Sequence, residues 1–219
     1  VAHLMGFLHR TSVLLSHGIH PVYVFDGPSP ELKADEIEQR RQRRIEAEEI
    51  HKEALAKGDF KLAQKMAQRI MHYSPEMVEE TKTLLDLLGV PWVDAAAEGE
   101  AQAAVMAMKG QLDVVATQDW DALLYGSPLL VRNLMNDGST SHGRIVHAQE
   151  IHLQTMLEAL SISREQLVDL AIMIGTDFHP GMKGIGPKTG LKLIREHKTM
   201  EAICELKGHD VPENLAEIR

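Results

Sequence analysis

Residues 113–134 read DVVATQDWDALLYGSPLLVRNL, and they begin and end in short apolar runs, 113–117 and 128–134. Each run is rich in aliphatic or β-branched residues and is flanked by turn residues, which is typical of a short buried strand. Two carboxylates, Asp119 and Asp121, directly follow the first run. The stretch therefore predicts two strands with an acidic turn after the first of them.

Helical patterns precede these strands. Apolar residues recur at helical spacing over 77–88 and 101–108, and the two patterns end at Gly89 and Gly110. Residues 21–25, PVYVF, form another short apolar run that predicts a strand. Strands that alternate with helices are typical of a parallel sheet covered on both faces. The predicted fold class is α/β, with a mostly parallel central sheet flanked by helices.

A long charged stretch interrupts this alternation. Residues 31–72 predict two helices joined by a turn at Lys57-Gly58-Asp59, and such an insertion is expected to stand away from the core as an arch or lid. The last part of the chain reads as helical throughout, with a glycine-rich hairpin between two helices. We therefore expect a core over 1–160, with a helical arch over about 29–73, and a helical part over 161–219.

Charge is unevenly distributed along the chain. The formal net charge of −9 argues against a polyanionic partner, but residues 76–126 hold ten acids against two bases, whereas residues 181–198 hold five bases against Glu196 alone. An acidic centre beside basic patches suits a metal-dependent enzyme that acts on a polyanion. Cys204 is the only cysteine, which excludes an internal disulfide and a thiolate zinc site and fits a reducing cytoplasm. No apolar run is long enough to predict a membrane span.

Six carboxylates stand at the edges of apolar segments: Asp26, Glu98, Glu100, Asp119, Asp121 and Asp177. The acids that follow strands are expected to converge at the carboxyl edge of the sheet, and Asp119 and Asp121, as alternate residues of an extended chain, would point to one site. We expect Glu98 just before a helix and Glu100 in its first turn, since two residues so spaced diverge around a regular helix.

Clustered carboxylates repel one another unless a cation compensates them. Any one of the six would more simply cap a helix or a turn, but this explanation is weak for all six in this order. Oxygen ligands alone favour Mg²⁺ or Mn²⁺ over zinc, and two such ions roughly 4 Å apart can catalyse phosphodiester hydrolysis. The sequence therefore predicts a metal-dependent hydrolase of nucleic acid.

Two basic segments accompany the acids. Lys33 and Arg40 are seven residues apart in the first predicted arch helix, with Arg43 and Arg44 following, so a cationic face could hold a phosphate. A solvated face balanced by neighbouring glutamates is an equally good explanation.

Residues 183–190, KGIGPKTG, predict the hairpin between helices. Gly184 and Gly186 would let the backbone approach a phosphate, and Lys188 would add charge, with Lys192 one turn further along. An ordinary tight turn is the alternative, and the position straight after Asp177 favours phosphate binding.

The motifs VFDGPSPELK, EGEAQAA, TQDWDALLYGSP, GTDF and GIGPK, in this order, resemble those of the structure-specific 5′ nucleases, and specifically of archaeal flap endonucleases. The resemblance runs from about His3 to the end of the chain. It implies that the six acids bind two Mg²⁺, with Mn²⁺ as a substitute. It further implies that Lys33 and Arg40 contact the scissile phosphate and that the arch receives a 5′ flap. It also implies that a helix-two-turn-helix module around Gly184 and Gly186 grips duplex DNA, with K⁺ held by the carbonyl groups of Gly181, Met182 and Ile185.

Members of that family have further segments at both ends. The resemblance implies an additional metal-binding aspartate before Val1 and a peptide after Arg219 that docks on the sliding clamp. We therefore expect a Mg²⁺-dependent flap endonuclease core, a hydrolase of DNA replication and repair, which acts on branched DNA in the cytoplasm of an archaeal cell. Two alternatives remain: a DNA-binding fragment without catalysis, and a repair endonuclease or exonuclease of the same superfamily. The repair type carries a long insertion between the positions of Asp26 and Glu98, which this chain lacks.

Overall fold

The computed structural model describes residues 1–70, 73–141 and 143–219 of the chain. It contains two compact units, which are described separately: unit 1 comprises residues 1–23 and 30–93, and unit 2 comprises residues 24–29 and 94–219. The α/β class predicted from the sequence is confirmed. The predicted boundary between residues 160 and 161 does not coincide with this division and stays a prediction.

Unit 1 is mainly helical. Its helices are α1 (Ala2–Ser16), the 3₁₀ turn η1 (Glu31–Lys33), α2 (Ala34–Ala56), α3 (Phe60–Ile70) and α4 (Pro75–Leu88). Helix α4 starts at Ser74, whose hydroxyl accepts the Met77 N–H at 3.3 Å, and it ends at Gly89, which adopts the left-handed conformation (φ 66°). The helix end that the sequence predicted at Gly89 is therefore confirmed.

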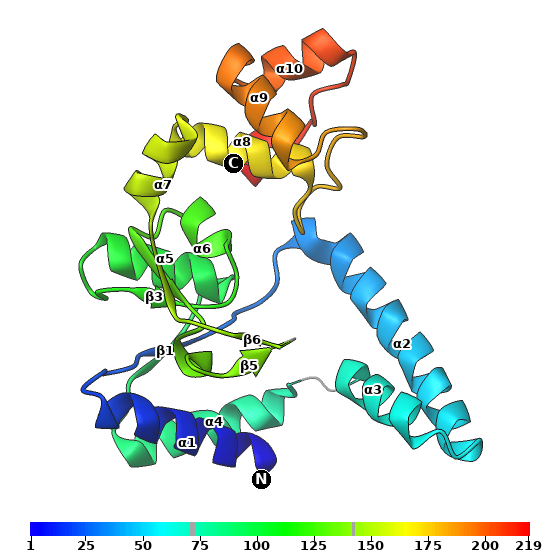
Figure 1. The fold of residues 1–219 in the computed structure, drawn as a ribbon, viewed down its shortest axis with the longest axis vertical. Coiled ribbons are helices and arrows are strands. Elements are labelled where there is room, and N and C mark those ends of the chain that lie inside the picture. The colour runs from blue at the N-terminus through cyan, green and yellow to red at the C-terminus, as the bar shows by residue number, and fades with distance from the viewer. Residues whose placement is uncertain (71–72, 142) are drawn as a thin grey trace. The chain divides into compact units, whose positions relative to one another are not determined.

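Helices α2 and α3 are the two helices that were predicted for the arch, and they pack against each other next to the turn that joins them (Figure 1). Small buried residues, Ala47 and Ala54 of α2 and Ala63 of α3, allow the two helices to approach closely. Gly58 makes the turn in the left-handed region (φ 72°), and the Asp59 carboxylate accepts the Leu62 N–H at 3.0 Å. The predicted interruption at residues 57–59 is thus confirmed, while Met71 and His72, the end of the predicted second helix, lie outside the described residues.

Short strands and their connecting helices make up the first half of unit 2. Strands β3 (Val115–Ala116), β4 (Leu129–Arg132) and β7 (Gln149–His152) form a three-stranded sheet. Strands β1 (Tyr23–Phe25) and β2 (Trp92–Asp94) form a two-stranded sheet, whose residues are divided between the two units. A small antiparallel ribbon joins β5 (Thr140–Ser141) to β6 (Arg144–Ile145). The helices are α5 (Gly99–Met108), α6 (Asp121–Leu124) and α7 (Leu153–Leu160), and η2 (Leu134–Asn136) is a 3₁₀ turn.

The three-stranded sheet is mixed. Strand β4 runs parallel to β3, with Val115 opposite Leu130, and antiparallel to β7, with Leu130 opposite Ile151. A parallel partner requires a crossover connection, which the segment containing α6 supplies, whereas an antiparallel partner does not. The expected parallel pairing of the strands at 113–117 and 128–134 is therefore present, and the antiparallel strand β7 was not predicted.

The second half of unit 2 is a group of helices: α8 (Arg164–Ile174), α9 (Pro187–His197), α10 (Met200–Lys207) and the short α11 (Leu215–Ile218). Helices α8, α9 and α10 pack on one another (Figure 1). Their fully buried side chains include Met173, Ile194 and Ile203, which belong to the same apolar core as Leu123 and Leu130 near the sheet. The core thus connects the helical group to the strands.

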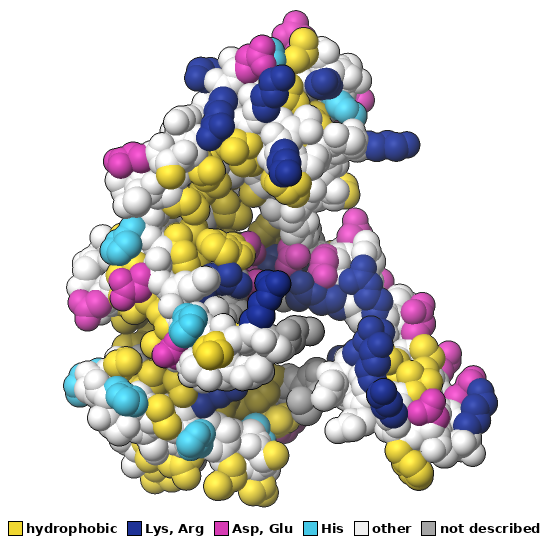
Figure 2. Space-filling model, in the orientation of Figure 1, with side chains coloured by type: hydrophobic (Ala, Val, Ile, Leu, Met, Phe, Trp, Pro, Cys, Tyr) yellow, Lys and Arg dark blue, Asp and Glu magenta, His cyan; other side chains and the backbone are white. Residues whose placement is uncertain are grey.

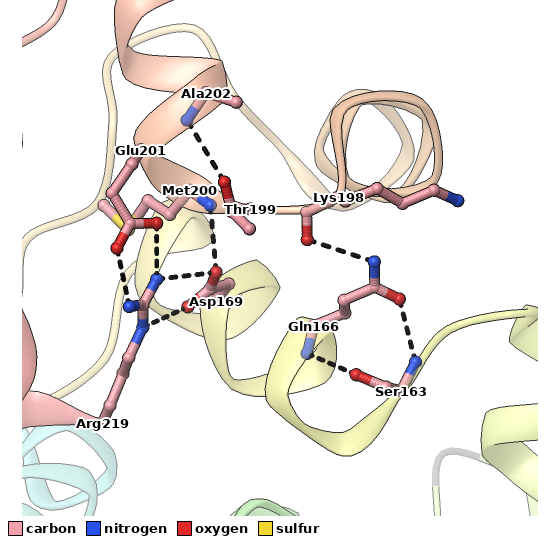
Figure 3. Close-up of polar contacts among 9 residues, drawn as sticks. All are labelled: Ser163, Gln166, Asp169, Lys198, Thr199, Met200, Glu201, Ala202 and Arg219. Atoms are coloured by element: carbon pink, nitrogen blue, oxygen red, sulfur yellow. Dashed lines mark hydrogen bonds and ion pairs between the residues drawn. The ribbon is translucent and has the colours of Figure 1, made fainter.

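A buried carboxylate fixes the helical group (Figure 3). Asp169 of α8 is 4% exposed and accepts the Met200 N–H at the start of α10 at 2.9 Å. Arg219 donates to both Asp169 oxygens, at 2.7 and 2.9 Å, and also to Glu201. Beside it, Gln166 bonds to Ser163 and to the Lys198 carbonyl group. Paired in this way, the buried charge of Asp169 stabilises the packing of α8 against α10.

No helix within the described residues is both long enough and apolar enough to cross a membrane.

Candidate metal and nucleic-acid site

Asp26 lies at the start of helix α5. One of its carboxylate oxygens, Oδ1, accepts the Gly99 N–H at 2.8 Å, and the Gly27 N–H donates to the Ala97 carbonyl group at 2.7 Å. A Cβ atom on Gly27 would lie 2.1 Å from the Ala95 carbonyl oxygen, and one on Gly99 would lie 2.9 Å from Asp26 Oδ1. The two segments approach this closely only because both positions are glycine. Asp26 therefore caps α5 from a distant part of the chain.

Glu98 and Glu100 stand where the sequence predicted them relative to the helix. Glu98 is the N-cap residue of α5, with an extended backbone (φ −78°, ψ 131°), and Glu100 lies in the first turn. Negative charges are stabilised at a helix N-terminus, where backbone N–H groups remain unpaired within the helix. The start of α5 thus carries two acids of its own and contacts the carboxylate of Asp26.

Glu100 is half-buried, and its surroundings connect three of the predicted acids. Its Oε1 atom accepts the Thr117 hydroxyl at 3.3 Å, and the same hydroxyl oxygen accepts the Asp119 N–H at 3.2 Å. The pKa of Glu100 is raised, first because burial removes water from the carboxylate, and further because the charges of Asp26 and Asp119 repel it. Hydrogen bonds from the backbone and from Thr117 oppose this rise. Asp26, Glu100 and Asp119 therefore share one electrostatic environment.

The expectation that Asp119 and Asp121 lie in an extended chain is wrong. Trp120, between them, has helical backbone angles (φ −85°, ψ −12°), and Asp121 is the first residue of α6. The helix begins directly after the turn because residues 121–124, DALL, favour it and an acid is stabilised in a first turn. The two carboxylates are consequently not related by the alternation of a strand.

Asp177 follows α8 in a tight turn. The Thr176 N–H donates to the His179 carbonyl group at 2.8 Å, and the Phe178 N–H donates to the Thr176 hydroxyl at 3.2 Å. Gly175, which ends α8, has a φ of 120° and would place a Cβ 3.2 Å from the Pro180 carbonyl oxygen. Asp177 belongs to unit 2, as do the other five acids.

The six carboxylates fit a magnesium site in chemistry, because all supply hard oxygen ligands. In the part of the chain that the structure describes, no group of three or more histidine, cysteine, aspartate and glutamate side chains has an arrangement that could hold a metal ion. The described contacts connect only part of the set, because the charges of Asp26 and Asp119 both act on Glu100. Coordination by all six acids stays a prediction.

The cations of the arch belong to unit 1. The expectation that Lys33 and Arg40 share one helix is wrong, because Lys33 ends the 3₁₀ turn η1 and caps α2, which begins at Ala34. Arg40 pairs with Glu36 one turn earlier, and its side chain is 63% exposed. Basic side chains nevertheless gather along the arch (Figure 2). They line an open hollow, whose lining includes Arg40, Arg41, Arg43, Arg44, Arg69, Ile50 and Met66.

The predicted hairpin joins α8 to α9. Gly184 is left-handed (φ 85°), and the Ile185 N–H donates to the Met182 carbonyl group at 3.0 Å. Gly186 is the N-cap residue of α9, so Lys188 lies in the first turn of that helix and Lys192 one turn later. A Cβ on Gly190 would lie 2.7 Å from Leu170 Cδ1, so this glycine permits the close packing of α9 on α8. Binding of K⁺ by Gly181, Met182 and Ile185 stays a prediction.

Sequence analysis missed three residues that shape the acidic site. Gly27 and Gly99 allow the close approach of Asp26 to α5, and Thr117 bridges Glu100 to the backbone of Asp119. A threonine two residues before an aspartate is typical of a turn closed by the hydroxyl group, so Thr117 carried a recognisable signal. The roles of the glycines depend on contacts between distant segments, which no local pattern reveals.

Comparisons with known proteins agree with the motifs. A family model of the XPG N-terminal domain matches residues 1–47, and a model of the XPG I-region matches residues 89–177. Flap endonuclease 1 of Hyperthermus butylicus is 49% identical over 218 residues, which cover 96% of this chain and 62% of that protein. Flap endonuclease 1 of Pyrococcus furiosus is 47% identical, with 90% of this chain and 60% of that protein covered.

Solved structures are similar as well. Flap endonuclease-1 from Methanococcus jannaschii matches 97% of this chain and 64% of its own length, with 43% identity and a TM-score of 0.68. The catalytic core of Rad2 in complex with a DNA substrate matches 94% of this chain and 56% of its own length, with 26% identity and a TM-score of 0.71. The chain spans about 60% of the length of the curated relatives named above. The two XPG models together match more than half of the chain, which therefore belongs to the XPG family, and the curated relatives named above are flap endonucleases.

Proposed function

We propose that this chain is the core of a structure-specific 5′ nuclease that cuts DNA carrying a 5′ flap and acts in replication and repair. The observation that supports this most is the environment of Glu100, whose half-buried carboxylate is repelled by Asp26 and Asp119. Repelling carboxylates at a helix start are costly to the fold unless they bind a cation. Relatives named flap endonuclease 1 share nearly half of the aligned residues.

In the proposed site, Asp26, Glu100 and Asp119 would hold Mg²⁺, and Glu98, Asp121 and Asp177 would complete the set of ligands for two ions. Divalent cations, when bound, lower the pKa of a water molecule and stabilise the charge that develops on the leaving oxygen. Asp26 orients its carboxylate through the Gly99 N–H, and Thr117 holds Glu100 relative to Asp119. Mn²⁺, another hard cation with oxygen ligands, would substitute for Mg²⁺.

Basic groups would bind the polyanion. We propose that Lys33 and Arg40 contact the scissile phosphate, and that Arg43 and Arg44 bind the DNA strand along α2. The arginines of α2 support this, because Arg40, Arg41 and Arg43 are exposed and guanidinium groups pair with phosphate oxygens. At the hairpin, Gly184, Gly186, Lys188 and Lys192 would grip duplex backbone without reading its sequence.

Family resemblance alone supports the remaining proposals: a K⁺ ion at the hairpin, a sliding-clamp partner for the whole protein, and a place among the DNA of the cytoplasm.

A cleavage assay tests the proposal. DNA labelled at the 5′ end of a flap, incubated with the protein and Mg²⁺, should yield a short labelled product, whereas a blunt duplex without a flap should not. Asp121→Ala should abolish cutting while keeping much of the affinity for the flap DNA. If the variant cut as fast as the wild type, Asp121 would have no place in the site.

A second function, DNA binding without catalysis, is favoured by the finding that, within the described residues, no group of three or more histidine, cysteine, aspartate or glutamate side chains is arranged to hold a metal ion. The same assay separates the two functions. Tight binding of the flap DNA by the wild type in Mg²⁺, with no product at any protein concentration, would exclude the nuclease and support the binding function.

A further inference from the structure

Arg132 contacts the acidic turn from the neighbouring strand. It is the last residue of β4, and its guanidinium Cζ lies 4.4 Å from the centre of the Trp120 ring. Its Nε atom donates to the carbonyl group of Gln118 at 3.0 Å. Gln118 and Trp120 flank Asp119, so one side chain makes two contacts within the turn that carries Asp119 and leads to Asp121.

The sheet holds Arg132 in place. Val131, its neighbour, lies opposite Ala116 in the parallel pair and accepts the Thr117 N–H at 3.2 Å. On the other side of β4, Arg132 lies opposite Gln149 of β7. The guanidinium group therefore extends from a strand that is paired on both sides, whereas the acidic turn lies beyond the end of the short strand β3.

Burial does not hold the turn. Trp120 is 48% exposed, so its indole is not fixed by packing in the core. A guanidinium group over an indole ring is attracted by the ring's electron density, and the planar group can bond a carbonyl oxygen at the same time. The two contacts together restrict both the ring and the backbone on either side of Asp119.

We propose that Arg132 is a positioning residue, which holds the turn of Asp119 and Asp121 in the shape that binds divalent metal. It acts through Trp120 and Gln118 and touches neither metal nor substrate. The inference rests on the proposed function, since it concerns the same acids. Neighbours that orient metal ligands typically change metal affinity roughly 10-fold to 100-fold when they are removed.

Metal titration tests the proposal, and a second cation and ring pair provides a matched control. Lys82 lies 4.8 Å from the centre of the Trp92 ring in unit 1, whereas the six acids belong to unit 2. Isothermal titration with Mg²⁺ should show a dissociation constant for Arg132→Ala raised roughly 10-fold or more, with Lys82→Ala unchanged. Arg132→Lys, which keeps a cation but loses the planar fork, should fall between the wild type and Arg132→Ala.

Tryptophan fluorescence of the metal-free protein measures how firmly the Trp120 ring is held. In a Trp92→Phe background, Trp120 is the single fluorophore of its kind, because the chain has two tryptophans. Arg132→Ala should make its emission more easily quenched by acrylamide, while circular dichroism shows an unchanged fold. Metal affinity within twofold of wild type, or unchanged quenching, would overturn the positioning role and leave the proposed function intact. Failure of the wild type to bind Mg²⁺ would overturn both the positioning role of Arg132 and the proposed function.

Discussion

Replacing Asp26 with asparagine and with alanine separates two roles of its carboxylate. The side chain accepts the Gly99 N–H at the start of α5, and its charge repels Glu100. Asparagine keeps an acceptor oxygen but removes the charge, whereas alanine removes both. Because the two variants lose the same repulsion, the difference between their stabilities reports the hydrogen bond and the packing of the atoms that carry it.

The size of that difference follows from the geometry. The bond is 2.8 Å long and partly buried, and it serves one of the backbone N–H groups that the helix leaves unpaired. Loss of an N-cap acceptor costs roughly 0.5–2 kcal/mol, so Asp26→Ala should be about 1–2 kcal/mol less stable than Asp26→Asn. For a chain of this length, each kcal/mol lowers the melting temperature by roughly 2–4 °C.

Urea denaturation of the metal-free proteins measures the difference in unfolding free energy between the two variants. Thermal melts with and without Mg²⁺ measure the contribution of the Asp26 charge to metal binding. Mg²⁺ should raise the melting temperature of the wild type and leave both variants almost unchanged, since each lacks the charge that binds metal. Equal stability of the two variants would show that Asp26 does not cap α5. Full stabilisation of Asp26→Asn by Mg²⁺ would remove Asp26 from the metal site.

Three further predictions concern other parts of the molecule. Because the pKa of Glu100 is raised in the folded state, its contribution to stability is present at acid pH and is lost as pH rises through the folded-state pKa. Glu100→Gln should therefore stabilise the metal-free protein at neutral pH. Urea denaturation should show this gain vanish at acid pH. Gly27→Ala should lower the unfolding free energy by about 3 kcal/mol or more, because its Cβ would meet the Ala95 carbonyl oxygen at 2.1 Å. Gly6→Ala is the control: Gly6 lies within α1 with nothing within 4 Å of an added Cβ, so this variant should gain roughly 0.5–1 kcal/mol. Equal effects of the two variants would contradict the close approach at Gly27. Lys188→Ala should weaken DNA binding equally for unrelated duplex sequences, and it should reduce the slope of log binding constant against log salt concentration by about 1. Lys207→Ala, at the end of α10, is the control. A sequence-selective loss of affinity would argue against backbone binding.

Local patterns predicted the features whose causes are local. The end of α4 at Gly89, the turn at Gly58 and the N-cap position of Glu98 each depend on a few neighbouring residues, and all three are present. The start of α6 at Asp121 was missed because a helix of four residues leaves no periodic pattern. Strand β7 was missed because its residues, Gln149–His152, are mostly polar and exposed and so show no apolar alternation.

In the candidate site, too, local sequence predicted the residues but not their contacts. Composition and order singled out the six acids, but their environment depends on contacts across long sequence separations. Asp26 bonds to Gly99, and Arg132 reaches back to the turn at Trp120. Such contacts depend on the packing of strands and helices, and a side chain such as Arg132 has no motif of its own to mark it.

Direct measurement of Mg²⁺ binding by the wild type and by Glu100→Gln tests the central claim, that repelling carboxylates at the start of α5 form a metal site. Glutamine keeps the size of the side chain and removes its charge. Calorimetric titration should show Mg²⁺ binding to the wild type and a large loss of affinity in the variant, although the variant is the more stable protein without metal. Equal Mg²⁺ affinity of the two proteins would contradict the claim.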